Sequence, residues 1–149
     1  MATADSPGVH VPPPFIYVAV FAVGWVLRGL LPRLQLLPLA VALALIAVVL
    51  AGWAMGRFAR VKTSIIPNQP ATAFVTDGPY RWSRNPMYVA LAIAYVSTSL
   101  WTASLTSLLL LPLALFLIDR LVIAREERYL RARFGDDYQH YCARVRRWL

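Results

Sequence analysis

Cysteine and charged side chains are both scarce in this sequence. Of its 149 residues one is cysteine, Cys142, so no intrachain disulfide can form and nothing requires an oxidising compartment. Charged residues make up 15% of the chain and hydrophobic residues 59%, which excludes a disordered protein. The two histidines, His10 and His140, are distant in the chain and lack metal-ligand spacing, so we expect no metal site.

Acidic residues are fewer than basic ones, 7 against 15, which gives a formal net charge of +8. Mean hydropathy is nevertheless +0.57, because long runs of the chain carry no charge at all. A soluble domain of this length could not bury those runs. The sequence therefore predicts an all-α polytopic membrane protein with a single integral-membrane domain over residues 1–149.

The uncharged runs predict about four transmembrane helices. Each span needs about 20 apolar residues to cross the hydrocarbon core. Residues 87–118 are too long for one span, so we expect a helical hairpin that turns at residues 101–104, with a kink at Pro112. No Lys or Arg precedes Pro14, so we expect the first run to be a span and not a cleaved signal peptide. The expected spans are approximately residues 15–31, 34–55, 87–102 and 104–124.

The basic residues predict the orientation of these spans. Of the 15, 13 lie in residues 56–86 and 119–149, which an even number of intervening spans would place on one side. We therefore expect residues 56–86 to form a cytoplasmic loop, residues 125–149 to form cytoplasmic amphipathic helices, and both termini to be cytoplasmic. A three-span arrangement would put one basic segment outside. The positive charge fits contact with membrane lipids and predicts no nucleic-acid partner.

A first polar motif, Thr76 to Tyr88, precedes the third expected span. We expect the Asn85 side chain to cap that helix and Pro86 to occupy its first position. The aromatic residues Tyr80 and Tyr88 fit a membrane interface. The same helix start, with Arg84 beside it, would also suit a carboxylate or a phosphate.

A second motif, Arg125 to Tyr141, predicts a helix that ends at Gly135 and a short final helix after it. The 4, 3, 4 spacing of Ile123, Glu127, Leu130 and Phe134 puts Glu127 on an apolar stripe. A surface pair between Glu127 and Arg131 is an equally good interpretation, and Glu126 is expected to be a surface acid. Small residues at Gly52 and Gly56, and at Ala90 and Ala94, indicate close helix packing and would permit a homo-oligomer.

Together the two motifs resemble the signature of the integral-membrane methyltransferases, the isoprenylcysteine carboxyl methyltransferase and phospholipid methyltransferase superfamily. The resemblance covers Thr76 to Leu149, and Asn85 stands where the family usually has histidine. Its residues are Gly78-Pro79-Tyr80-Arg81, Arg84-Asn85-Pro86-Met87-Tyr88, Glu126-Glu127, Leu130, Phe134-Gly135, Tyr138, Tyr141, Val145 and Arg147.

The resemblance implies methyl transfer from S-adenosylmethionine to an amphipathic acceptor at the cytoplasmic membrane face. The acceptor would be an isoprenylcysteine-like carboxylate or a phospholipid-like amine that enters from the bilayer. By analogy, Arg84 and the start of the helix would receive the cofactor's carboxylate, and Glu126 or Glu127 its ammonium or a ribose hydroxyl. The implied cofactor site comprises Gly78, Tyr80, Arg84, Asn85, Pro86, Tyr88, Glu126 and Glu127.

The implied catalytic residues are Glu127, Arg84 and Arg147. A carboxylate acceptor would need a nearby cation, for which Arg84 or Arg147 is suited. An amine acceptor must lose a proton, and Glu127 would be its base if apolar surroundings raise its pKa. Three alternatives remain: a four-helix transporter, a membrane reductase with a nicotinamide cofactor, and an inert scaffold. A transporter usually needs an ionisable residue within a span, and the centres of the expected spans have none.

Overall fold

The protein is all-helical over the residues that the structure describes. The computed structural model gives residues 8–9, 11–61 and 74–149; the other residues, including His10 and part of the expected cytoplasmic loop, lie outside the description. The all-α prediction is confirmed. In chain order the elements are α1 (Pro13–Val26), the 3-10 turn η1 (Arg28–Leu30), α2 (Leu37–Val61), the 3-10 turn η2 (Gly78–Arg81), α3 (Pro86–Trp101), α4 (Leu105–Leu109), α5 (Leu111–Ile118), the π-helical turn η3 (Asp119–Ile123) and α6 (Ala124–Arg144).

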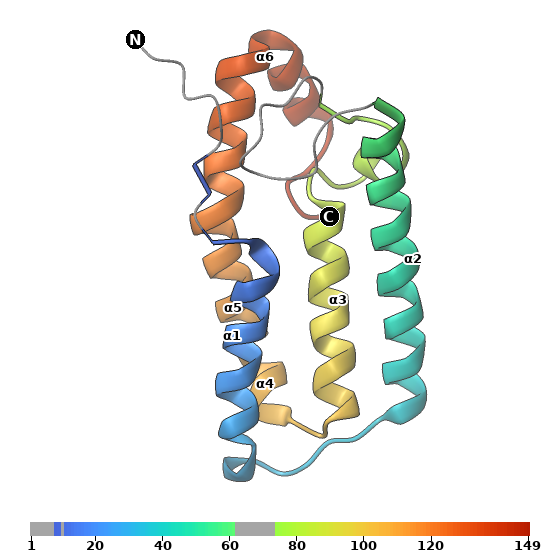
Figure 1. The fold of residues 1–149 in the computed structure, drawn as a ribbon, viewed down its shortest axis with the longest axis vertical. Helices are drawn as coiled ribbons and strands as arrows, with labels where there is room; N and C mark the ends of the chain where they lie inside the picture. The colour runs from blue at the N-terminus through green and yellow to red at the C-terminus, as the bar shows by residue number, and fades with distance from the viewer. Residues whose placement is uncertain (1–7, 10, 62–73) are drawn as a thin grey trace.

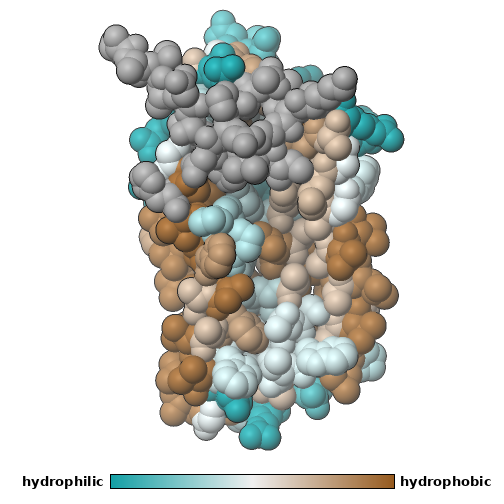
Figure 2. All heavy atoms as spheres, in the orientation of Figure 1, coloured by the Kyte–Doolittle hydropathy of each residue, from teal (hydrophilic) through white to brown (hydrophobic). Residues whose placement is uncertain are grey.

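The chain runs along the bundle four times (Figure 1). The end of α2, the start of α3 and the far part of α6 lie toward one end, α1 begins lower, beside α6, and the connections η1 and α3–α4 lie at the other end. Brown, apolar side chains cover the flanks of the bundle and teal, polar ones gather at its ends (Figure 2). Of the helices in the described ranges, α2 is long and apolar enough to cross a membrane, and α1 and α3 are shorter apolar helices.

Several helix limits differ from the expected spans. The first helix ends at Val26 and not at Leu31, whereas α2 begins at Leu37 and continues six residues past Met55 to Val61. The expected single helix over residues 104–124 is interrupted: α4 ends at Leu109 and α5 begins at Leu111. Pro112 occupies the first turn of α5, where its missing N–H and its ring are tolerated, which explains the break.

The start of α3 follows the predicted pattern in its backbone but not in its cap. Asn85 is the N-cap residue and Pro86 the first helical residue, as expected. The Asn85 side chain makes no capping hydrogen bond, however, so that part of the prediction is wrong. Its Nδ2 donates instead to the carbonyl of Arg147, 2.9 Å away, because the C-terminal segment lies against this turn.

The turn after α3 brings α4 against α1. Trp101 ends α3 and Ser104 caps α4, so the chain reverses where the sequence predicted. Ser104 Oγ also donates to the carbonyl of Gly24, 3.4 Å away. A Cβ atom on Gly24 would lie 2.4 Å from the Cα of Ser107, so only glycine permits this approach of the two helices.

α2 packs mainly against α3, through a single seam of alanines. Ala40, Ala47 and Ala54 are buried, and Ser97 of α3 donates to the carbonyl of Ala40, 2.7 Å away. The expected close packing at Gly52 and Gly56 is wrong for the single chain, since open space surrounds both. Most large side chains of α2 are exposed, which suits a helix surrounded by lipid.

Candidate functional site

The C-terminal strap, residues Val145–Arg147, crosses the turn that precedes α3. Ser83 and Arg146 form an isolated parallel bridge, and the N–H of Arg84 donates to the carbonyl of Arg146, 2.9 Å away. Together with the bond from Asn85 to Arg147, these contacts join the end of the chain to the η2–α3 connection. The strap therefore brings residues about 60 positions apart in the sequence into one site.

Arg84 is held on several sides by the protein itself. Its Nη1 donates to the carbonyls of Cys142 and Val145, at 3.1 and 2.9 Å. Its Nε and Nη2 donate to Oε1 of Glu127, at 3.2 and 2.8 Å. All three guanidinium nitrogens are thus engaged, so Arg84 serves to join α3, α6 and the strap. A cofactor carboxylate would have to compete with Glu127 for it.

Glu127 is the centre of the ion-pair network. Its side chain is 6% exposed, and Arg147 donates to both of its oxygens, with Nη2 2.6 Å from Oε2. Arg147 also binds Asp119 through Nη1, at 3.0 Å. Arg131, the expected surface partner, is more distant at 3.8 Å and is 53% exposed. Glu127 is therefore buried. The expected pair with Arg131 is present but long, and it does not lie on a solvated surface.

This network determines the charge of Glu127. Burial alone would raise its pKa, but hydrogen bonds and positive charge from Arg147 and Arg84 outweigh burial and hold the pKa below its usual value. The prediction that Glu127 has a raised pKa and acts as the base is therefore wrong. A carboxylate held ionised by two arginines is a poor proton acceptor at neutral pH.

Glu126 has the opposite environment. It is partly buried and not a surface acid as expected, and the hydroxyl of Tyr88 donates to its Oε1 at 2.8 Å. Within the described parts of the chain, no arginine forms an ion pair with it. Burial raises its pKa, the hydrogen bond from Tyr88 opposes that rise, and the neighbouring charge of Glu127 adds to it. Among the residues that the structure describes, Glu126 is the acid of this site without an ion-pair partner.

Tyr80 and Gly78 lie on the α2 side of the site. Tyr80 is buried beside Phe58, and Tyr141 of α6 donates to the carbonyl of Tyr80 at 2.7 Å. Burial raises the pKa of Tyr80, so its hydroxyl stays protonated. Gly78 has a φ of +59°, and a Cβ there would lie 2.6 Å from Nε of Arg57, so the turn requires glycine.

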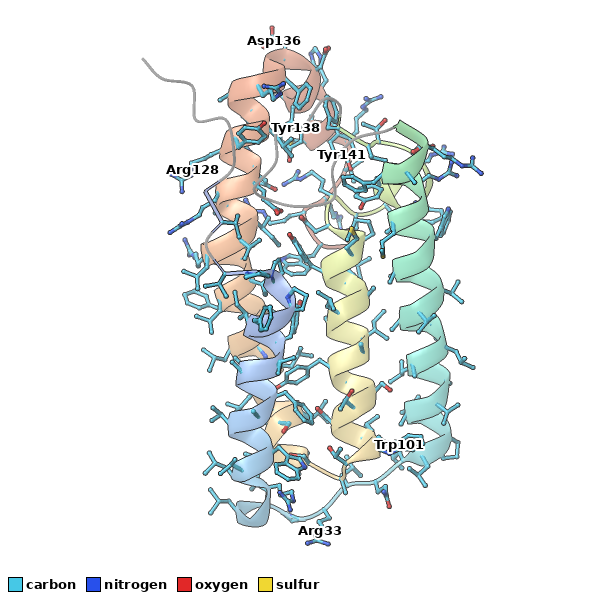
Figure 3. The ribbon with its side chains drawn as sticks, in the orientation of Figure 1. Arg33, Trp101, Arg128, Asp136, Tyr138 and Tyr141 are labelled. Carbon is cyan, nitrogen blue, oxygen red and sulfur yellow. The ribbon has the colours of Figure 1, made fainter. Side chains whose placement is uncertain are left out.

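The structure gathers most of the predicted site residues into one cluster. Tyr88 binds Glu126, and Asn85 binds the backbone of Arg147, which itself pairs with Glu127. Pro86, at the start of α3, is fully buried. Gly78 lies by Arg57 instead, where its backbone conformation accounts for its presence. Tyr138 and Tyr141, labelled in Figure 3, close the same end of the bundle.

Sequence reasoning missed three members of this site. Asp119 holds Arg147, Tyr17 donates to the carbonyl of Tyr88 at 3.0 Å, and Cys142 supplies a carbonyl to Arg84. Asp119 lies eight residues before Glu127, so the acidic spacing was a usable signal. Cys142 contacts Arg84 through its backbone carbonyl, and a pattern of side chains cannot predict a backbone contact.

The described residues form an all-helical protein with one candidate membrane-span helix, α2, and a network of ionisable groups at one end of its bundle. The chain belongs to the phospholipid methyltransferase family, whose family model matches residues 35–137. That match begins before α2 and ends after the Gly135 kink of α6. It includes Arg84, Glu126 and Glu127 and leaves out α1 and Arg147.

Three proteins with similar sequences bear on this family. An uncharacterised protein of Haemophilus influenzae is 38% identical over 63 residues, 42% of this chain and 100% of that protein. A protein-S-isoprenylcysteine O-methyltransferase of Schizosaccharomyces pombe is 38% identical over 71 residues, 48% of this chain and 30% of that protein. A nickel-cobalt-cadmium resistance protein, NccN, of Alcaligenes xylosoxydans is 34% identical over 98 residues, 64% of this chain and 46% of that protein. The chain thus spans less than half of the two named relatives, and no solved structure matches it.

Proposed function

We propose that this protein transfers the methyl group of S-adenosylmethionine to an amphipathic acceptor drawn from the membrane. Membership of the phospholipid methyltransferase family supports a methyl transfer that uses this cofactor. The observation that carries the proposal is Glu126, a partly buried acid bound by Tyr88 and lacking an arginine partner in the described chain. Such an acid suits a cationic ligand, because a nearby cation would offset the cost of its burial.

The residues of the site fit the chemistry of the cofactor. S-Adenosylmethionine supplies an activated methyl group on a positively charged sulfonium and carries an ammonium in its amino-acid tail. Glu126 would hold one of these positive groups, and the ring faces of Tyr80 and Tyr88 lie at the same end of the bundle, where they would favour a cation. Arg84 is engaged by Glu127, so we assign it to positioning and no longer to the cofactor's carboxylate.

The ion-pair network would then act through geometry. Methyl transfer is a direct displacement, in which catalysis depends on holding the reacting groups in line. Glu127, Arg84 and Arg147 join the starts of α3 and α6 to the strap, and so fix the positions of Tyr88 and Glu126. We therefore treat Glu127, Arg84 and Arg147 as positioning residues.

The acceptor is proposed to be an isoprenylcysteine-like carboxylate or a phospholipid-like amine. Arg147 and Arg84 are already paired with acids, so they are less able to bind an acceptor carboxylate. For an amine acceptor, Glu126 is a group that could accept the proton that the amine loses. Entry from the bilayer is supported by the exposed apolar flanks of the bundle (Figure 2). The two acceptor classes are separated by supplying each to the purified protein with labelled cofactor.

Calorimetric titration of the detergent-purified protein tests the proposed cofactor. We expect saturable binding of S-adenosylmethionine and S-adenosylhomocysteine and none of NADPH, which represents the reductase alternative. Glu126→Gln should weaken S-adenosylmethionine binding at least about ten-fold, equivalent to 1.4 kcal/mol. Asp137→Asn, which changes an exposed acid of the same helix, is the matched control and should bind normally. Absence of binding by folded wild-type protein would reject the proposal.

A further inference from the structure

A groove with a volume of about 190 Å³ lies between α1 and α3. One face of each helix lines it, including Tyr17 and Phe21 of α1 and Ala94, Tyr95 and Thr98 of α3. An apolar cavity of roughly 150 Å³ is enough to hold benzene, whereas pockets for whole ligands are roughly 300–1,000 Å³. This groove therefore suits a slim portion of a larger molecule.

The floor of the groove is apolar although tyrosines form it. The rings of Tyr17 and Tyr95 are buried with their centroids 6.2 Å apart, and Phe21 packs edge-on against Tyr95. Their hydroxyls donate elsewhere, Tyr17 to the carbonyl of Tyr88 at 3.0 Å and Tyr95 to that of Ser107 at 2.7 Å. The hydroxyls of both tyrosines are therefore already engaged, and neither needs a ligand in the groove as a partner.

The rim of the groove offers no charge and no unused donor. Thr98 donates to the carbonyl of Ala94 in its own helix, 2.8 Å away, and none of the described lining residues is Asp, Glu, Lys, Arg or His. Thr98 and Val18 are exposed, so the groove opens on the outside of the bundle. In Figure 2, paler side chains lie between the brown flanks on this face of the bundle. A hydrocarbon chain is the ligand chemistry that such a surface accepts.

One end of the groove meets the candidate site. Tyr17, which forms the floor, donates to the backbone of Tyr88, and the hydroxyl of Tyr88 donates to Glu126. From Leu91 to Thr98 the α3 face extends about 10 Å at 1.5 Å per residue, away from that contact. A chain in the groove would therefore have its head end beside Tyr88 and Glu126.

We propose that the α1–α3 groove binds the hydrocarbon chain of the methyl acceptor and presents its head group at Tyr88. This inference rests on the proposed function, and it adds the place and the chemistry of acceptor binding. The occupant is a single chain, because the volume is too small for a second helix. Continuity with the site through Tyr17 and Tyr88 separates this groove from the exposed apolar surface of α2.

Photocrosslinking in lipid nanodiscs tests the proposal directly. The probe is an unbranched alkylamine with a diazirine in mid-chain, and the corresponding alkyl carboxylic acid is used in a second arm. Ala94→Phe fills the groove, and Ala44→Phe, at an exposed position of α2, adds the same group outside it. Melting temperatures of both variants establish that they fold.

We expect crosslinks on the groove faces of α1 and α3 that excess unlabelled alkyl compound displaces. Ala94→Phe should reduce them about ten-fold, the effect of 1.4 kcal/mol, and Ala44→Phe should leave them unchanged. The more strongly bound arm identifies the head group as amine or carboxylate. Crosslinks spread equally over α2 and unaffected by Ala94→Phe would overturn the proposal.

Calorimetry with S-adenosylmethionine on the same samples separates the two possible failures. Binding of the cofactor without specific crosslinking would overturn the groove alone. Specific crosslinking by protein that does not bind the cofactor would reject the proposed function, and with it the assignment of the bound chain to a methyl acceptor.

Discussion

Glu127 lies between two arginines that reach it from different parts of the chain, Arg84 from the turn before α3 and Arg147 from the C-terminal strap. Removing one partner of a buried ion pair typically costs about 3–5 kcal/mol, because the other charge stays buried without a partner. Arg147 is 35% exposed, and solvent will screen part of that loss. We expect Glu127→Gln to lower the free energy of unfolding by about 2–3 kcal/mol.

Arg131→Ala is the control for this prediction. It removes only the contact of 3.8 Å from an exposed arginine, so its effect should stay below about 0.5 kcal/mol. Denaturant unfolding in detergent, followed by tryptophan fluorescence, measures both variants. Equal stability of the two would mean that the network does not hold α3, α6 and the strap together.

Replacing Glu126 should raise the free energy of unfolding at pH 7, whereas replacing Glu127 should lower it. Its pKa in the folded protein lies above its usual value of 4.5, mainly because of burial, so folding favours the protonated form. The stability linked to this group is complete below pH 4.5 and declines as the pH rises through the folded pKa. Glu126→Gln should therefore unfold less readily than wild type at pH 7 and equally at pH below 4.5. Unfolding curves across this pH range without cofactor check the prediction, and a pH-independent difference would contradict it.

The sequence placed Glu127 on an apolar stripe and left a surface pair with Arg131 equally open, but it did not predict the pairing with Arg84 and Arg147. Helical spacing places Glu127 on the stripe of Ile123 and Leu130, and that pattern is local. Arg84 and Arg147 are 43 and 20 residues away, and only the folded chain brings them to Glu127. The same limit explains the error at Glu126, whose partner Tyr88 lies on a different helix.

At the scale of the helices, the contact between α1 and α4 depends on Gly24. A Cβ at Gly24 would lie 2.4 Å from the Cα of Ser107. This is a backbone atom, so a change of side-chain rotamer cannot relieve the clash. Overpacking of this kind typically costs about 1–3 kcal/mol, so Gly24→Ala should destabilise the protein by that amount. Gly29→Ala, where nothing lies within 4 Å, is the matched control and should be close to neutral. Similar melting temperatures for the two variants would show that α1 does not pack against α4 in this way.

The sequence predicted helix limits where a local signal marks them, and it failed where no such signal exists. Asn85-Pro86 before α3 and Gly135 within α6 are local signals, and the backbone has a helix start at the first and a φ of 50° at the second. The π-helical turn η3 has no comparable signal, because its residues are compatible with an ordinary helix. It contains Asp119, which binds Arg147, 28 residues away, so this part of the fold depends on a distant contact.

At the scale of the whole molecule, the helices differ in how well they match a bilayer. At 1.5 Å per residue, α2 is about 37 Å long, whereas α1 is about 21 Å and α3 about 24 Å, against a hydrocarbon core of about 30 Å. Short helices can be accommodated by local thinning of the bilayer or by flanking residues. The antiparallel order of the four passes in Figure 1 is the arrangement that four spans require.

Reporter fusions test whether this order is a membrane topology. The basic residues of α6 and of the η2–α3 connection share one end of the bundle, as the pairing of Arg84 with Glu127 requires, and such residues are retained in the cytoplasm. We therefore expect alkaline phosphatase to be inactive when fused after Leu149 and active when inserted near Arg33 or at Ala103, in the connections at the opposite end. A cytoplasmic reporter, green fluorescent protein, should give the reverse pattern at the same positions. Activity of alkaline phosphatase after Leu149 would place the ion-pair network outside the cytoplasm, where it would lack the cytoplasmic cofactor, and would exclude both the expected orientation and the proposed reaction.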